Sequence, residues 1–461
     1  MSSPHSFNPT VLREYDIRGV VGDSLSVADA RALGHAFGTA VRRKGGSKMA
    51  LGFDGRATSP DLAAALTEGL TATGLDVECV GIGPTPLLYY AVHHLGADGG
   101  VMVTGSHNPP DYNGFKMVWG GGAPVYGSEI QELGRLAATG DFTTGNGSAR
   151  DVDIFEDYID RLLKDFDGHP LNIAWDPGNG AAGRTTEVLT ARLPGRHIVI
   201  NGDIDGTFPN HHPDPTVEAN LQQLKDVVLR EGLDLGIAFD GDGDRIGAVD
   251  SKGRVVWGDQ LLLIMARHLL EELPGATVIA DVKASQVLFD GIAAAGGEPV
   301  MWKTGHSLLK VKMAELGAPL AGEMSGHIFF KDKFYGYDDA LYDGLRLMNA
   351  ISAAGGDLAA IMDAMPHLHN TPEIRFDCPE DRKWQVVEEV RDRLAATDAE
   401  VIDVDGVRVI SEDGWWLLRA SNTQPVLVVR AESQHADGLD RLKTQIRDQL
   451  SQSGVRAPAD L

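Results

Sequence analysis

Short apolar runs that end in glycine-rich polar turns alternate with alanine-rich stretches of helical period along most of this 461-residue chain. Continuous apolar runs of this length favour buried strands, and the helical period favours amphipathic helices. The alternation therefore predicts an α/β fold. The pattern changes near residue 371, where short strand-like runs flank a charged helical stretch at 383–394. This last part predicts a small α+β domain.

The α/β part contains a weak threefold repeat, with units that start near residues 49, 171 and 277. Each unit has a strand and loop, a second strand ending in a glycine turn, and a third strand that delivers a polar loop. These third loops are Thr104-Gly105-Ser106, Asp240-Gly241-Asp242 and Glu323-Met324-Ser325. We expect three related α/β domains that each aim one loop at a shared place. The expected domains are 1–150, 151–252, 253–368 and, for the α+β part, 369–461.

Composition narrows the range of partners. The formal net charge of −25 argues against nucleic acid or an anionic membrane as the main partner. No stretch approaches the roughly 18 apolar residues of a membrane span, and the N-terminus lacks the features of an export signal. Cys79 and Cys378 are the only cysteines, which fits a reducing compartment. We expect a cytoplasmic protein, and an anionic substrate would need basic residues gathered locally.

The serine loop follows the apolar run Val101 to Val103. Pro109 and Pro110 cannot continue a central strand, because proline has no N–H to give to the ladder. Ser106 is therefore expected on a tight loop at the carboxyl end of a buried strand, where ligands gather in open α/β sheets. His107 is its neighbour, and Lys116 follows once the chain has turned.

The second loop carries Asp240, Asp242 and Asp244, separated by glycines, directly after a strand. Three carboxylates spaced in this way can surround one hard cation, and oxygen ligands suit Mg²⁺ or Ca²⁺. An EF-hand is excluded because it needs glycine where Arg245 stands and glutamate where Ser251 stands.

Other polar loops complement these two. Glu323 and Ser325 suit the vicinal hydroxyls of a sugar, and the segment 419–423 combines a guanidinium, two hydroxyls and an amide, which favours phosphate. Further cationic or donor groups stand at other strand ends or near the N-terminus. The full candidate binding set is Tyr15, Arg18, Lys283, His306, Glu323, Ser325, His327, Arg419, Ser421, Asn422 and Thr423.

The sequence contains one pattern that resembles a dinucleotide-binding motif and has no P-loop motif. Residues 178–183 match G-x-G-x-x-G after a strand, and Asp203 lies 20 residues beyond Gly183. The strand delivers Asp176 and Pro177 directly into the turn, however, and the serine and aspartate loops would not serve hydride transfer. A dehydrogenase is therefore disfavoured, and the absence of a P-loop motif disfavours a P-loop kinase.

Four motifs together resemble the α-D-phosphohexomutase superfamily, and most closely its bacterial phosphomannomutase/phosphoglucomutase branch. They are T-G-S-H-N-P-P at 104–110, D-G-D-G-D-R at 240–245, G-E-M-S-G-H at 322–327 and R-A-S-N-T at 419–423. The resemblance implies three related α/β domains and a TATA-box-binding-protein-like fourth domain around a central cleft. It implies that Ser106 is a phosphoserine and that Mg²⁺ is bound by Asp240, Asp242 and Asp244, with Ser106 as a further ligand.

The activity that the resemblance implies is a Mg²⁺-dependent exchange of a phosphoryl group between O1 and O6 of a hexose phosphate, mannose or glucose. Ser106 would be the carrier, with hexose 1,6-bisphosphate as intermediate and activator. Arg245 and Lys116 would lie close to the transferring group, and either Lys116 or His107 would act as the base. Glu323 and Ser325 would contact the sugar, and the loop 419–423 would hold the phosphate that is not reacting.

Three alternatives remain at this point. A phosphoglucosamine mutase is disfavoured by Met324, where that branch has glutamine. A metal-dependent sugar phosphatase could use the same serine, but it would need no second phosphate site. A non-enzymatic sugar-phosphate-binding protein would not need three carboxylates beside a serine.

Overall fold

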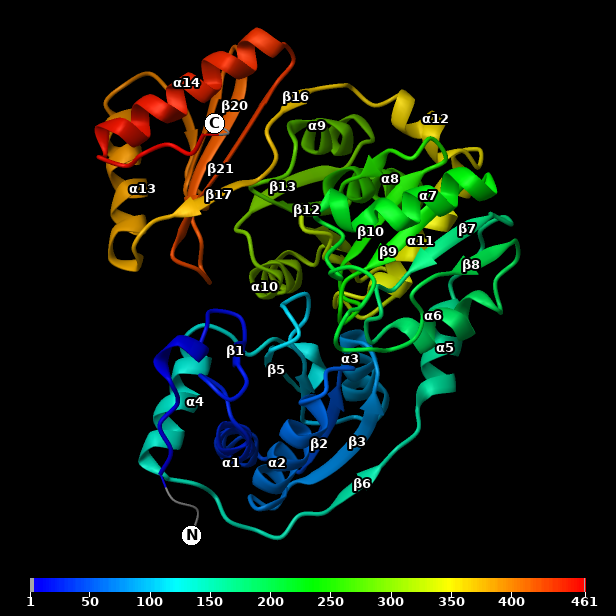
Figure 1. The fold of residues 1–461 in the computed structure, drawn as a ribbon, viewed down its shortest axis with the longest axis vertical. Coiled ribbons are helices and arrows are strands. Elements are labelled where there is room, and N and C mark those ends of the chain that lie inside the picture. Colours follow the sequence, from blue (N-terminus) through cyan, green and yellow to red (C-terminus); the bar gives the residue numbers. More distant parts are fainter. Residues whose placement is uncertain (1–3, 460) are drawn as a thin grey trace.

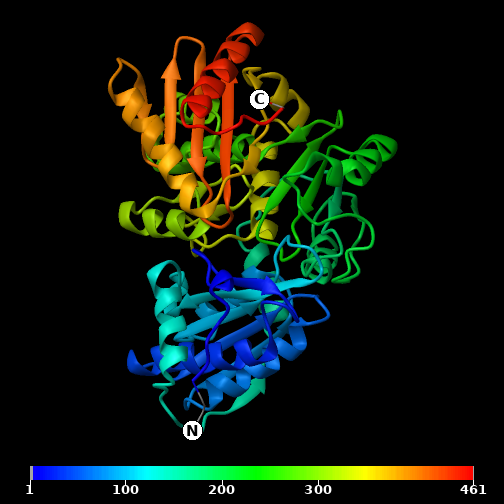
Figure 2. The ribbon, with the colours of Figure 1, turned by 60° about the vertical axis from the view of Figure 1, so that its left-hand side comes forward.

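Four β-sheets organise the chain, and each is formed by one continuous stretch of sequence (Figure 1). The computed structural model describes residues 4–459 and 461. The first sheet and its helices form a lobe on one side of the molecule, and the other three regions lie together opposite it (Figures 1 and 2). The three α/β regions and the α+β region predicted from the sequence pattern are confirmed.

The first sheet has the strand order β1-β5-β4-β2-β3-β6. Its strands are β1 Ile17–Val20, β2 Lys48–Phe53, β3 Asp76–Ile82, β4 Gly99–Val103, β5 Tyr112–Trp119 and β6 Ala149–Asp151. The helices of this stretch are η1 Pro9–Val11, α1 Val27–Arg43, α2 Ser59–Thr71, α3 Thr85–His94, η2 Gly120–Gly122 and α4 Ser128–Thr139. Helix α1 begins with a capping box between Ser26 and Asp29, which satisfies two otherwise free N–H groups.

The second sheet has the order β11-β10-β9-β7-β8. Its strands are β7 Ile173–Asp176, β8 His197–Val199, β9 Leu235–Phe239, β10 Ile246–Asp250 and β11 Val255–Val256. The helices here are α5 Phe155–Leu163, α6 Gly183–Thr190, η3 Glu218–Leu221 and α7 Gln222–Glu231.

The third sheet has the order β13-β12-β14-β15. Its strands are β12 Thr277–Asp281, β13 Glu298–Trp302, β14 Leu320–Gly322 and β15 Ile328–Phe330. The helices are α8 Gly258–Glu272, α9 Gln286–Ala294, α10 His306–Leu316, α11 Ala340–Ala353 and α12 Leu358–Asp363.

The threefold repeat is visible in the strand pairing. The first strand of each unit (β2, β7 or β12) pairs in parallel with the next two strands of that unit. The third strand then pairs antiparallel with the strand that follows it, as β4 with β5, β9 with β10, and β14 with β15. The serine, aspartate and glutamate loops are therefore topologically equivalent, because each one joins these last two strands at a carboxyl end.

The fourth sheet is antiparallel, and its two faces pack against different partners. Its strands and helices are β16 His369–Asn370, β17 Ile374–Asp377, α13 Glu380–Ala395, β18 Glu400–Ile402, β19 Val407–Ser411, β20 Gly414–Ala420, β21 Val426–Ser433 and α14 Ala436–Gln452. Trp416 and Leu418 of β20 face the core shared with α13 and α14, whereas Trp415 and Leu417 pack with Val282 of the third region. The alternation of side chains along a strand explains this division.

The hydrophobic core does not follow the sheets strictly. One large cluster includes residues of α3 together with residues of the second and third sheets and of α8 and α11. A separate cluster lies among α1, α2, α4 and the first sheet. Helix α3 therefore anchors the first region to the other two. Over the part of the chain that the structure describes, no helix is both long enough and apolar enough to span a bilayer.

Candidate active site

The polar loops of all four regions line one cavity of about 990 Å³. The first region contributes Ser106 and His107, the second Arg245, the third Glu323 and Ser325, and the fourth the loop 419–423. The predicted residues that line it are Tyr15, Arg18, Ser106, His107, Lys116, Arg245, Lys283, His306, Glu323, Ser325, His327, Arg419, Ser421, Asn422 and Thr423. Groups from distant parts of the sequence thus meet at one place.

Ser106 lies at the carboxyl end of β4 with a positive φ of 50°, a conformation that is uncommon for residues other than glycine. Its side-chain Oγ lies 3.1 Å from Asp240 Oδ2 and 3.2 Å from His107 Nδ1. The residue is only 2% exposed in this arrangement. The serine hydroxyl therefore faces both a carboxylate of the second region and an imidazole.

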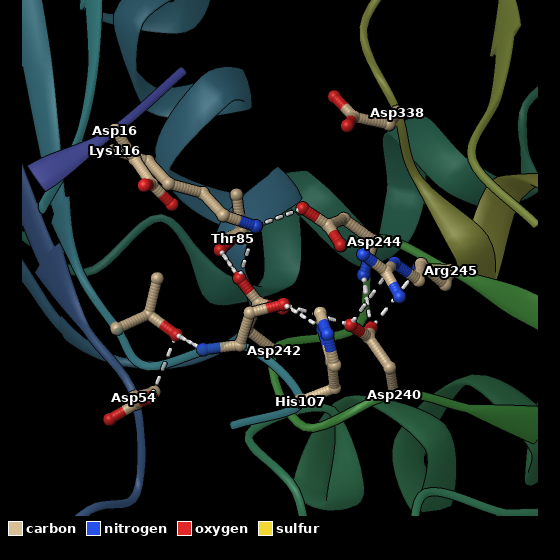
Figure 3. A network of polar contacts seen from close by, with 12 residues as sticks. Asp16, Asp54, Thr85, His107, Lys116, Asp240, Asp242, Asp244, Arg245 and Asp338 are labelled. Carbon is tan, nitrogen blue, oxygen red and sulfur yellow. Dashed lines mark hydrogen bonds and ion pairs between the residues drawn. The ribbon is translucent and has the colours of Figure 1, made fainter. Parts of the chain in front are cut away.

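Asp240, Asp242 and Asp244 lie fully buried behind the surface of the cavity. Lys116 from β5 donates to Asp242 Oδ2 at 2.7 Å and also to Asp244 Oδ2 (Figure 3). Burial lowers the pKa of Lys116, but the attraction of Asp242 and Asp244 outweighs it and raises the pKa overall. Burial, followed by repulsion from the other carboxylates, raises the pKa of Asp240 well above its ordinary value. One lysine therefore does not balance the charge of the three acids.

The three carboxylates fit a divalent cation. Their oxygen atoms lie within 4.8 Å of one another. Among the described residues, Oδ1 of Asp242 and Oδ1 of Asp244 are buried and have no hydrogen-bond partner. Buried polar atoms are almost always partnered, and oxygen-only ligands suit Mg²⁺. A cation at this place would satisfy the two oxygens and offset the excess negative charge.

Arg245 and His327 link the aspartate loop to the third region. Arg245 Nε donates to His327 Nε2 at 3.0 Å, so the other ring nitrogen of His327 carries the proton. That nitrogen, Nδ1, lies 3.1 Å from the backbone oxygen of Asp244 and 3.2 Å from Asp338 Oδ2. His306 lies beside it, with the two ring centroids 5.3 Å apart. The orientation of Arg245 is thus fixed by an oriented histidine.

Glu323 and Ser325 form a fixed pair on the loop after β14. The hydroxyl of Ser325 donates to Glu323 Oε2 at 3.0 Å, and the backbone N–H of Gly305 donates to Glu323 Oε1 at 2.6 Å. Each carboxylate oxygen has further lone pairs, so it can still accept from a ligand hydroxyl.

The fourth-region loop contacts both the first and the third regions. Asn422 Nδ2 donates to the hydroxyl of Tyr15 at 2.5 Å, and this hydroxyl donates to the backbone oxygen of Thr304 at 2.9 Å. Asp405 accepts from Arg419 Nε and from the backbone N–H of Thr304, both at 3.0 Å. The loop 419–423 is therefore tied to the first region through Tyr15 and to the third through Asp405 and Thr304.

The remaining basic groups are also held by acids. Lys283 Nζ lies 2.8 Å from Glu373 Oε2, and Arg18 pairs with Asp16 while donating to Asn108 Oδ1 at 2.5 Å.

Burial, with repulsion from Arg245 and Arg18 next in size, lowers the pKa of His107 well below its ordinary value. The imidazole beside Ser106 is therefore neutral at pH 7, whereas Lys116 is charged.

Several residues of the site were not identified from the sequence. Asn108, Asp214, Arg375 and Arg430 line the cavity, and Asp338 orients His327 behind it. Asn108 lies within the serine motif and could have been chosen on that ground. Arg430 carries no local signal, because it reaches the site through contacts with the third region, and Asp338 meets His327 only through the packing within the third region.

Family models for four successive domains match the chain. They are phosphoglucomutase/phosphomannomutase alpha/beta/alpha domain I at residues 9–144, domain II at 156–253, domain III at 257–368 and the C-terminal domain at 373–449. Four matches in this order, on a fold with four loops around one cavity, define an α-D-phosphohexomutase.

Individual proteins agree with this class. The chain is 44% identical over 442 residues to a phosphomannomutase/phosphoglucomutase of Pseudomonas aeruginosa, which covers 96% of the chain and 95% of the relative. It is 40% identical over 451 residues to a phosphoglucomutase of Neisseria gonorrhoeae, and this match covers 96% of the chain and 97% of the relative. The chain also matches the solved structure of a phosphoglucomutase/phosphomannomutase family protein of Burkholderia thailandensis, with a TM-score of 0.93 and 41% sequence identity. This match covers 99% of the chain and 100% of the solved structure. The chain belongs to the phosphoglucomutase/phosphomannomutase family.

Proposed function

We propose that this protein interconverts hexose 1-phosphate and hexose 6-phosphate, of glucose, mannose or both, with Ser106 as the phosphoryl carrier. The observation that carries the proposal is that Ser106, which contacts the buried three-carboxylate cluster through Asp240, lines the same cavity as the loop 419–423. Relatives that are 40–44% identical over nearly the whole chain bear the names of such mutases.

The phosphoryl group on Ser106 is transferred to the free hydroxyl of the bound hexose monophosphate, which gives a hexose 1,6-bisphosphate. The bisphosphate then turns, and its other phosphate returns to Ser106. Phosphoryl transfer depends mainly on positioning and on neutralisation of charge. Asp240, Asp242 and Asp244 would hold Mg²⁺, which would supply this neutralisation beside Ser106. Arg245 adds a fixed positive charge beside the transferring group.

The return step needs a group that accepts the proton of the Ser106 hydroxyl, because a free serine is a weak nucleophile. His107 Nδ1 lies 3.2 Å from Oγ, whereas the ammonium of Lys116 is bonded to two carboxylates. Geometry therefore favours His107 as the acceptor and Lys116 as a stabilising charge. A candidate base must first of all lie within hydrogen-bond reach of the proton that it takes.

Glu323 and Ser325 are the candidates for the sugar hydroxyls, since they line the same cavity as the serine loop and the loop 419–423. Arg18, Lys283 and His306 add donors along the cavity wall. Arg419, Ser421, Asn422 and Thr423 would bind the phosphate that is distant from Ser106. A phosphatase needs no such second phosphate site, which is why a mutase is favoured. The two cysteines are free, which suits a reducing cytoplasm as the place of action.

The proposal is tested with the purified protein and with the variant Ser106→Ala. Intact-mass and peptide analysis should find one covalent phosphate on Ser106 of the parent protein and none on the variant. A coupled assay with glucose 1-phosphate and mannose 1-phosphate should show turnover by the parent and loss of nearly all turnover in Ser106→Ala. Turnover near the parent value in the variant would refute the serine carrier.

A further inference from the structure

Arg56 lies directly beneath the serine loop, although it takes no part in the reaction proposed above. It is 2% exposed and belongs to the loop between β2 and α2. Its Nη2 donates to the backbone oxygens of Ser106 at 2.7 Å and Asn108 at 2.6 Å. Its Nη1 donates to the backbone oxygens of Pro109 and Tyr112. A single buried guanidinium thus binds four carbonyl groups of the segment that carries the reacting serine.

Asp54 completes this support. It accepts from Arg56 Nε at 3.1 Å and therefore balances the buried charge. The same carboxylate accepts from the Thr104 hydroxyl at 2.8 Å and from the backbone N–H of Gly105 at 3.1 Å. The Thr104 hydroxyl in turn accepts from the backbone N–H of Ser106 at 2.8 Å. The backbone carbonyl of Ser106 is therefore bound by Arg56, and its backbone N–H is linked to Asp54 through the Thr104 hydroxyl.

Two further neighbours, Gly105 and Phe208, surround the guanidinium group of Arg56. A Cβ atom at Gly105 would lie 2.5 Å from the guanidinium carbon of Arg56, so the loop can approach only because residue 105 is glycine. The same guanidinium carbon lies over the ring of Phe208, from the second region, 5.2 Å from the ring centroid, which is within the range of a cation–π contact. The position of the guanidinium therefore depends on two regions of the fold.

These contacts explain how Ser106 keeps its φ of 50°. A non-glycine residue in this conformation persists only where the surrounding structure determines it. The serine loop contains two prolines and three small residues but few buried apolar side chains of its own, so its shape depends on hydrogen bonds. Arg56 supplies four of them.

We propose that Arg56 is a positioning residue that, together with Asp54 and Thr104, holds Ser106 Oγ in line for phosphoryl transfer. The proposal rests on the function proposed for Ser106. Arginine is required because its planar fork has five fixed N–H groups, which match four carbonyls and one carboxylate. Lysine has only three donors at a single point, so it cannot bind the same set of acceptors.

The test compares the phosphorylated, full-length parent with Arg56→Lys, which keeps the positive charge beside Asp54. Arg56→Lys should lower kcat by about 100-fold, the effect of an ångström-scale misplacement of a reacting group. KM for the hexose monophosphate should stay near the parent value, because the sugar-binding loops are untouched. Rates are expressed per mole of phosphoserine, so that misfolded protein does not count.

Thr104→Val provides a second, nearly isosteric variant, which removes the two hydrogen bonds of the Thr104 hydroxyl, the one to Asp54 and the one from the Ser106 N–H. It should lower kcat by about tenfold or more with KM retained, consistent with loss of these buried hydrogen bonds. Arg346→Met is the matched control, since Arg346 is another buried arginine, paired with Asp332 far from the serine loop. It should lower thermal stability without lowering kcat per mole of phosphoserine.

The outcomes separate the possibilities. Parent-like kcat in Arg56→Lys, or a loss explained entirely by fewer phosphorylated molecules, would overturn the positioning role. If Arg56→Lys yields no folded protein, parent-like kcat in Thr104→Val overturns it instead, and a selective loss of kcat supports it. A rise in KM alone would place the effect in substrate binding and would also overturn the proposal. If the parent itself has neither phosphoserine nor mutase turnover, it is the proposed function that fails.

Discussion

The buried ion pair between Lys283 and Glu373 joins the third region to the start of the fourth, and its contribution to stability should depend on pH. The two charged atoms lie 2.8 Å apart, and 8% and 18% of the respective side chains are exposed. Burial alone would raise the pKa of Glu373, but the attraction of Lys283, with Arg375 and Arg419 next in size, outweighs it and lowers the pKa to about 2. Replacing Glu373 by glutamine removes the charge that attracts these basic partners, of which Lys283 has the largest effect.

The magnitude follows from the difference between a pKa of about 2 and the ordinary value of 4.5. That difference corresponds to about 3 kcal/mol of unfolding free energy. Because the pKa of the folded state is depressed, the contribution is complete above pH 4.5 and is lost as the pH falls towards about 2. At pH 3.5 about 1.4 kcal/mol of it should already be lost. Burial lowers the pKa of Lys283, but Glu373 outweighs this and raises it above 10.5, so the lysine remains charged throughout the acid range.

Urea unfolding at pH 6 and pH 3.5, followed by tryptophan fluorescence, measures the effect. Trp415 and Trp416 of β20 report on the fourth sheet. Glu373→Gln should be less stable than the parent by about 3 kcal/mol at pH 6, and the difference should narrow by about 1.4 kcal/mol at pH 3.5. Glu380→Gln is the control, because Glu380 also pairs with a lysine but is 68% exposed.

The reasoning would be refuted by a difference between Glu373→Gln and the parent that is the same at both pH values. It would also be refuted if Glu380→Gln gave a destabilisation of equal size and pH dependence. In either case the attraction between Glu373 and its basic partners, Lys283 first among them, would not be what stabilises this junction.

Three further predictions concern the cavity. Removal of the metal with a chelator should abolish turnover, and added Mg²⁺ should restore it. Asp242→Asn should raise the Mg²⁺ concentration required for turnover. Full activity in excess chelator would contradict the cation site. Arg419→Ala should weaken binding of hexose monophosphate by about 2–5 kcal/mol and release more bisphosphate during turnover, whereas unchanged affinity without extra release would contradict the distant phosphate site. Glu323→Gln should slow reactions of glucose and mannose phosphates alike, because a neutral acceptor forms weaker bonds to their hydroxyls. Loss with only one sugar would mean that Glu323 contacts the 2-position.

The sequence by itself determined the threefold α/β plan and the additional α+β region. Its apolar runs mark β4, β9 and β14, and the polar residues directly after them mark the turns. A turn between two hydrogen-bonded strands is specified by residues close to one another in sequence. For this reason the sequence alone predicts that the loops of Ser106, Asp242 and Glu323 are equivalent.

Tertiary structure decided how these loops meet. The sequence did not indicate that the aspartates would be buried behind the cavity with Lys116 among them, or that Asp338 would orient His327. It also did not indicate that Arg56 would bind four carbonyls of the serine segment. Such contacts join residues about 10 to 130 positions apart, and they depend on the shapes of packed surfaces. Hydrophobic period and turn chemistry describe only near neighbours along the chain. Arg56 and Asp338 therefore acquire their partners when each region folds, and Lys116 acquires its partner where the first and second regions pack together.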